Sequence, residues 1–194
     1  MILYMIRHGE SEANAGGFHS GWSCVHLSEK GRMQAERARL MMEKIEIDEL
    51  YVSDILRTQE TAEIIFPGKD RKFMPLAREM NTTPLKGKTK DQLTAVFGET
   101  YLECRRKLDY TPLGMDCETI MHVSMRARQL LKWAKTQENK SICIVSHAGF
   151  IKAIAGWILS ITPHSDALSL DNASLSVFEF KNGNWRIKLW NQTP

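Results

Sequence analysis

Two segments of the sequence share one pattern: an apolar run is followed at once by a histidine and, within two residues, by a glycine. The first is Met1–Ile6 followed by Arg7-His8-Gly9, and the second is Ser141–Val145 followed by Ser146-His147-Ala148-Gly149. Short apolar runs of this kind are typical of strands buried on both faces of a parallel sheet. Because ligands bind at the carboxyl ends of such strands, both histidines are expected at that edge.

Between these runs the sequence alternates helical and strand-like patterns, which is typical of an α/β protein. Apolar positions spaced by three and four predict helices over about 29–45, 56–66, 117–136 and 150–160. Ser28 is a suitable cap for the first helix, and Ser53 or Asp54 for the second. Short strands are expected at Leu50–Val52 and Phe73–Leu76.

The C-terminal part carries a strong hairpin signal. Asn182-Gly183 lies between two strand-like segments, Ser174–Phe180 and Trp185–Trp190. The expected fold is therefore a three-layer α/β/α arrangement with a mostly parallel sheet and an antiparallel C-terminal edge.

The length of 194 residues, with 43% hydrophobic and 25% charged residues, is ordinary for one globular domain spanning residues 1–194. Two regions lack a regular pattern. Ser11–Ser23, rich in Gly and Ser, is interpreted as a loop over the first strand end. Residues 80–114, broken by Pro and Gly, are interpreted as an insertion or lid whose short helices cover the strand ends.

Several functional classes are not indicated. A net charge of +3 without a stripe of Lys and Arg argues against nucleic acid. The run Met1–Ile6 is too short for a signal peptide or membrane span, so we expect a cytoplasmic protein that does not bind membranes. Oligomeric state is not indicated. The cysteines form neither a zinc motif nor a disulfide framework: Cys24, Cys104, Cys117 and Cys143.

The charged residues near the strand ends indicate a phosphate pocket. Arg57 lies in the first turn of a predicted helix, where a cation opposes the helix dipole unless an anion is near. Taken singly, Arg7 or Arg57 could be an exposed ion-pair partner, and His8 or His147 a hydrogen-bonded structural residue. Together, two arginines and two histidines predict binding of a phosphoryl group without a metal or other cofactor.

The same residues suggest a reaction. A ring nitrogen of His8 could attack phosphorus to give a phosphohistidine, which water then hydrolyses. The leaving alkoxide needs a proton, and Glu79, which follows a short predicted strand, is the candidate donor.

The motifs around these residues resemble those of the histidine phosphatase superfamily, whose fold is that of phosphoglycerate mutase. Similar motifs occur in the same order along nearly the whole chain: Arg7-His8-Gly9-Glu10-Ser11, Leu27-Ser28-Glu29, Leu56-Arg57, Arg78-Glu79, Glu118 with Arg126, Ser146-His147-Ala148-Gly149, and Asp171-Asn172-Ala173-Ser174. The resemblance implies that His8 is the nucleophile and Glu79 the proton donor. It also implies a phosphate pocket formed by Arg7, Asn14, Arg57, His147 and the backbone N–H of Ala148.

The resemblance extends to the loop that would contact substrate. Phe18-His19-Ser20-Gly21-Trp22 resembles the loop of both mutases and α-ribazole phosphatases, so Phe18, Ser20, Gly21 and Trp22 are expected to influence specificity. A long basic insertion like that of the mutases is not evident. We therefore expect a phosphatase acting on a small phosphate ester, α-ribazole phosphatase-like or broad in specificity. A mutase-type phosphotransferase, a non-catalytic phospholigand-binding module and a histidine-based metal hydrolase remain alternatives.

Overall fold

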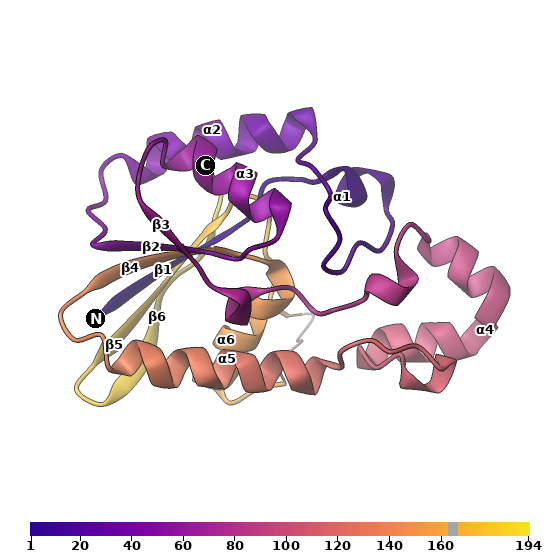
Figure 1. The fold of residues 1–194 in the computed structure, drawn as a ribbon. Helices are drawn as coiled ribbons and strands as arrows, with labels where there is room; N and C mark the ends of the chain where they lie inside the picture. Colours follow the sequence, from indigo (N-terminus) through magenta and orange to yellow (C-terminus); the bar gives the residue numbers. More distant parts are fainter. Residues whose placement is uncertain (163–166) are drawn as a thin grey trace.

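The computed structural model describes residues 1–162 and 167–194, and its centre is one six-stranded sheet with the order β3-β2-β4-β1-β5-β6 (Figure 1). The strands are β1 (Ile2–Arg7), β2 (Glu49–Val52), β3 (Arg71–Phe73), β4 (Ser141–Ser146), β5 (Leu175–Lys181) and β6 (Asn184–Gln192). Strands β3, β2, β4 and β1 run parallel, whereas β5 and β6 pair antiparallel at one edge. The expected fold class is thereby confirmed.

Helices cover both faces of the sheet. They are α1 (Glu12–Gly16), α2 (Glu29–Met42), α3 (Leu56–Ile65), α4 (Lys90–Lys107), α5 (Ile120–Lys135) and α6 (Ala148–Leu159). Helices α2 and α3 lie on one face, α5 and α6 lie on the other, and α4 projects beyond the sheet (Figure 1). The sheet is thus the middle of three layers, as expected from the alternation of helical and strand-like patterns.

The central strand β4 shows why the apolar runs lack polar residues. Its residues point alternately to two hydrophobic clusters: Ile142 and Ile144 pack on the α5 and α6 side, and Cys143 and Val145 on the α2 and α3 side. All four are fully buried. A strand buried on both faces needs an unbroken apolar sequence, so its polar residues can occur only at its ends.

Three local expectations were wrong. The segment Ser11–Ser23 contains the five-residue helix α1, because the side chains of Ser11 and Asn14 form a capping box. Strand β3 covers Arg71–Phe73 rather than Phe73–Leu76, because Pro75 begins a 3-10 helix.

The third correction concerns the start of α3. Its N-cap is Ile55, which provides no side-chain hydrogen bond, and neither Ser53 nor Asp54 caps it. Instead, the Ser53 hydroxyl lies next to His147, and the Asp54 carboxylate pairs with Arg78. The C-terminal hairpin is as expected, with positive φ at both Asn182 and Gly183.

The 80–114 region is organised around α4. The short helices expected in this region occur as the two parts of α4, which Gly98 interrupts with a φ of 56° and a ψ of −139°. Whether the region acts as a lid stays a prediction. Among the described residues, no helix is long and apolar enough to cross a membrane.

Candidate active site

The carboxyl ends of β1, β2 and β4 bring three buried side chains together. His8 follows β1, Arg57 lies in the first turn of α3 after β2, and His147 follows β4 as the N-cap of α6. Arg57 Nε lies 3.2 Å from His8 Nε2, and the rings of His8 and His147 are 5.1 Å apart. Each of the three is at most 4% exposed, so these contacts lie in the interior at this edge of the sheet.

The contacts of His8 define which ring nitrogen is free to react. Its Nδ1 lies 2.6 Å from the carbonyl oxygen of Gly9, which can only accept a hydrogen bond. Nδ1 therefore carries the proton, and the lone pair belongs to Nε2, the atom beside Arg57 Nε. A nucleophilic nitrogen is thus held next to a guanidinium group that could bind the group it attacks.

Three side-chain nitrogens at this edge of the sheet are buried and have no partner within residues 1–162 and 167–194. They are Arg7 Nε, Arg57 Nη1 and His147 Nδ1. Other atoms of both guanidinium groups are anchored, since Arg7 donates to the Leu170 carbonyl and Arg57 Nη2 to that of Gly21. Buried polar groups normally have partners, so these nitrogens indicate a site for an anionic ligand.

The electrostatics keep both histidines neutral. Burial lowers the pKa of His8 well below its ordinary value, and Arg57 and Arg7 lower it further. Burial also lowers the pKa of His147 well below its ordinary value, reinforced first by Arg57. Burial lowers the pKa of Arg57 itself to about 10, so this guanidinium remains cationic near neutral pH.

Glu79 places a carboxylate at the same edge. Its Oε1 accepts a hydrogen bond from the backbone N–H of Met80, and its Oε2 accepts one from that of Gly149 in the first turn of α6. Its negative charge favours the cationic forms of both Arg7 and Arg57. The carboxylate therefore belongs to the cluster expected from the sequence.

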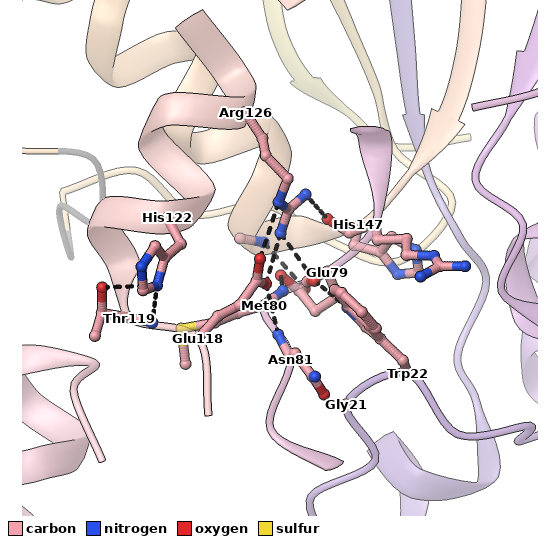
Figure 2. A network of polar contacts seen from close by, with 12 residues as sticks. Gly21, Trp22, Glu79, Met80, Asn81, Glu118, Thr119, His122, Arg126 and His147 are labelled. Atoms are coloured by element: carbon pink, nitrogen blue, oxygen red, sulfur yellow. Dashed lines mark hydrogen bonds and ion pairs between the residues drawn. The ribbon is translucent and has the colours of Figure 1, made fainter. Parts of the chain in front are cut away.

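Arg126 of α5 holds the segment that carries Glu79 (Figure 2). Its guanidinium group donates to both carboxylate oxygens of Glu118. It also donates to the carbonyls of Leu76, Arg78 and Glu79. From the other side, Trp22 Nε1 donates to the same Glu79 carbonyl at 2.7 Å. The position of Glu79 thus depends on two elements distant in sequence.

The expected specificity residues have different surroundings. Gly21 contacts Arg57 through its carbonyl, and Trp22 contacts Glu79, as described above. Ser20 forms a turn in which its carbonyl accepts from Ser23. Phe18 is partly exposed and bridges to Thr89 before α4. These contacts place the loop against Arg57, Glu79 and the 80–114 region, while its role in specificity stays a prediction.

Two expected phosphate ligands, Asn14 and Ala148, are not tested by these contacts. Asn14 is exposed, and its amide oxygen accepts from the Ser11 backbone and hydroxyl. No contact joins it to His8, Arg57 or His147 in the described part of the chain. Ala148 is the first residue of α6, where a free backbone N–H suits an anion.

A cavity of about 560 Å³ begins at Glu79 and Gly149. Its apolar lining includes Met80, Leu102, Leu108, Tyr110, Ile120 and Val123. Lys90, Arg105 and Arg106, all from α4, also line it. The sequence did not make a basic insertion evident, but the structure places these three cations around the cavity that the candidate proton donor also lines.

Sequence reasoning missed one contact of the site. Ser53 is fully buried, and its hydroxyl oxygen lies 2.9 Å from His147 Nε2. The position of Ser53 directly after strand β2 was the available sequence signal. Because serine is common at helix N-caps, the sequence favoured a capping role instead. Among the described residues, no group of three or more His, Cys, Asp or Glu is arranged to hold a metal ion.

The fold and the site have counterparts among known proteins. A family model described as the histidine phosphatase superfamily (branch 1) matches residues 3–193. The chain therefore belongs to this superfamily.

Its individual relatives include both mutases and phosphatases. The probable phosphoglycerate mutase GpmB of Photorhabdus laumondii is 31% identical over 194 residues, covering 97% of this chain and 89% of the relative. The structure of an Entamoeba histolytica phosphoserine phosphatase in complex with 3-phosphoglyceric acid is 28% identical, with a TM-score of 0.82 over 99% of this chain and 97% of that one. The α-ribazole phosphatase of Shigella flexneri has a TM-score of 0.87 over 99% of this chain and 96% of its own, but at 22% identity it shows the fold alone.

Proposed function

We propose that the protein is a metal-independent phosphomonoesterase that hydrolyses a small phosphorylated metabolite through a phosphohistidine on His8. The observation that carries this proposal is the contact between His8 Nε2 and Arg57 Nε, together with three buried nitrogens that have no partner in the part of the chain that the structure describes. A nucleophile and anion-binding groups thus meet at one point. Phosphoryl transfer needs chiefly positioning and charge stabilisation, which this cluster supplies.

The reaction proceeds in two displacements. In the first, Nε2 of His8 forms a bond to phosphorus while the bond to the ester oxygen breaks, and protonated Glu79 donates its proton to the leaving alkoxide. Arg7, Arg57 and His147 stabilise the phosphoryl oxygens. In the second, water attacks phosphorus, the P–N bond breaks, and the Glu79 carboxylate takes the proton of water. The products are an alcohol and inorganic phosphate.

The test measures phosphate release from p-nitrophenyl phosphate and a panel of metabolite phosphates in the presence of EDTA. Full activity with chelator is expected, and loss of activity that a divalent ion restores would favour the metal hydrolase. His26→Ala is a matched control for His8→Ala, because His26 is exposed and pairs with Glu60 away from the cluster. A wild-type protein that releases no phosphate from any ester would favour the phospholigand-binding module.

A mutase-type phosphotransferase is a second candidate. The cations Lys90, Arg105 and Arg106, which line the same cavity as Glu79, could retain a substrate that carries a second anionic group, as phosphoryl return requires. Incubation with 3-phosphoglycerate and 2,3-bisphosphoglycerate distinguishes the two reactions. Phosphatase activity gives free phosphate, whereas a mutase gives the 2-phosphoglycerate isomer without net release.

The same cations bear on substrate choice. Arg105 has no ion-pair partner in the described residues, and its charge acts on the nearby His19. We expect Arg105→Gln to raise KM for esters with a distal carboxylate or phosphate more than for uncharged alkyl phosphates. Lys107→Gln, on the same helix but outside the cavity lining, is the charge-matched control.

A further inference from the structure

The side chain of Ser53 is held in one place by its backbone. Its N–H donates to the Val145 carbonyl at 3.0 Å, which joins the end of β2 to β4. Its carbonyl accepts a hydrogen bond from the Thr58 hydroxyl at 2.7 Å. Ser53 is fully buried, so its hydroxyl group cannot use bulk water as a partner.

The only side-chain partner of this hydroxyl in the described part of the chain is His147 Nε2, at 2.9 Å. The other ring nitrogen of His147, Nδ1, is buried and has no partner among the described residues. His147 is itself fully buried, next to His8. One nitrogen of the imidazole thus points to Ser53, and the other is left for a ligand.

A neutral imidazole carries one proton, on either Nδ1 or Nε2. Burial and the nearby Arg57 keep His147 neutral by lowering its pKa. If Nε2 held the proton and donated it, the Ser53 hydroxyl would have a buried proton with no acceptor, which is unfavourable. If Ser53 donates to Nε2, its hydroxyl is satisfied, and the one donor of this pair without a partner is Nδ1–H, which can bind an anion.

We propose that Ser53 is a positioning residue that holds His147 in the tautomer with its proton on Nδ1. His147 then acts as a neutral hydrogen-bond donor to the phosphoryl group transferred to His8, and it does not serve as a proton acceptor. This assignment rests on the proposed function for its kinetic consequence, but the tautomer itself is a property of the free protein. This positioning role accounts for the Ser53 hydroxyl at the end of β2, which does not cap α3.

The direct test is the ¹⁵N spectrum of the histidine side chains of the labelled full-length protein, with His147 assigned by comparison with His147→Gln. Protonated and unprotonated ring nitrogens have well-separated shifts. The wild-type spectrum is expected to show a protonated Nδ1 and an unprotonated Nε2 for His147. A proton on Nε2 in the wild-type protein would overturn the proposal, and this measurement needs no substitution at Ser53.

The kinetics of Ser53→Ala provide a second test of the positioning role. Without the hydroxyl, the proton of His147 redistributes towards Nε2, and kcat is expected to fall about 10- to 100-fold, as when other side chains that orient a functional histidine are removed. Ser53→Thr keeps a hydroxyl and should restore both the tautomer and most of kcat. Ser176→Ala removes another fully buried strand serine, on β5, and should leave both unchanged.

The outcomes separate the two proposals. If wild-type protein hydrolyses no ester but shows protonated Nδ1, the proposed function fails and the tautomer assignment stands. If Ser53→Ala retains wild-type kcat and a protonated Nδ1, Ser53 has no positioning role, whatever the activity of the enzyme.

Discussion

Glu79 Oε2 accepts a hydrogen bond from the backbone N–H of Gly149 at 3.2 Å, and a Cβ on Gly149 would lie 2.3 Å from Glu79 Oε1. The glycine that follows the second histidine thus leaves room for the carboxylate. This contact ties the candidate proton donor to the helix α6 that His147 begins. The N-terminal end of α6 carries a partial positive charge, so its position next to the carboxylate is favourable.

Gly149→Ala should therefore impair catalysis without destabilising the fold. Alanine is preferred over glycine within a helix, by about 1 kcal/mol, so α6 itself should not be weakened. The added methyl group displaces the carboxylate of Glu79, and we expect kcat to fall roughly 100-fold. Steady-state kinetics and thermal unfolding of the same preparation check this. Wild-type kcat would show that the carboxylate need not occupy this position.

Glu79→Gln should reveal the role of the carboxyl group through the leaving group. Esters of weakly acidic alcohols need a proton on the departing oxygen, whereas p-nitrophenolate leaves without one. We expect kcat to fall about 100-fold or more for alkyl phosphates and much less for p-nitrophenyl phosphate. An equal loss for both substrates would assign the proton transfer to another group. Glu118 is a poor substitute, since both its oxygens accept hydrogen bonds from Arg126.

Arg126→Lys should disturb the position of Glu79 through the backbone segment that carries it. A lysine cannot reproduce the planar group that holds Glu118 and three backbone carbonyls. We expect the free energy of unfolding to fall by about 2 kcal/mol, together with a lower kcat. Arg128→Lys is the control, because Arg128 lies over the Trp157 ring and does not contact the Glu79 segment. Equal effects of both substitutions would contradict a specific role for Arg126.

Stability should depend on pH in a direction set by the buried histidines. The folded-state pKa values of His8 and His147 lie well below the ordinary value of 6.5. Below pH 6.5 the unfolded chain therefore binds protons that the folded chain does not, and the free energy of unfolding falls as the pH falls. Each histidine should contribute up to about 1.4 kcal/mol per pH unit.

Urea unfolding at pH 7.5 and pH 5.5 measures this dependence. Replacing both histidines by asparagine should make the pH dependence over this window shallower. A double variant that retains the wild-type pH dependence would show that neither imidazole is held neutral.

The parts of the fold predicted from sequence are those governed by local periodicity. The apolar runs that became β1 and β4, and the hairpin at Asn182-Gly183, carry their signal within a few residues. The Arg7, His8, Arg57 and His147 cluster was also predictable, because parallel strands meet at one edge.

The errors arose where tertiary contacts competed with local preference. Ser53 has the chemistry of a helix cap, but in the fold its hydroxyl meets His147, 94 residues away. The capping box of α1 lies in a stretch whose glycine and serine content favours a loop. Lys90 and the adjacent pair Arg105 and Arg106 lie at opposite ends of α4, and only the folded chain places them around one cavity.

The central claim is that His8 accepts the phosphoryl group, and rapid quenching with a ³²P-labelled ester tests it most directly. Wild-type protein should carry label that is stable in alkali and lost in acid, as a phosphohistidine is, and peptide mapping should place it on His8. His8→Ala should carry none and should lose turnover, while it still binds inorganic phosphate through Arg7 and Arg57. Label on another residue, or near-normal turnover by His8→Ala, would contradict the account.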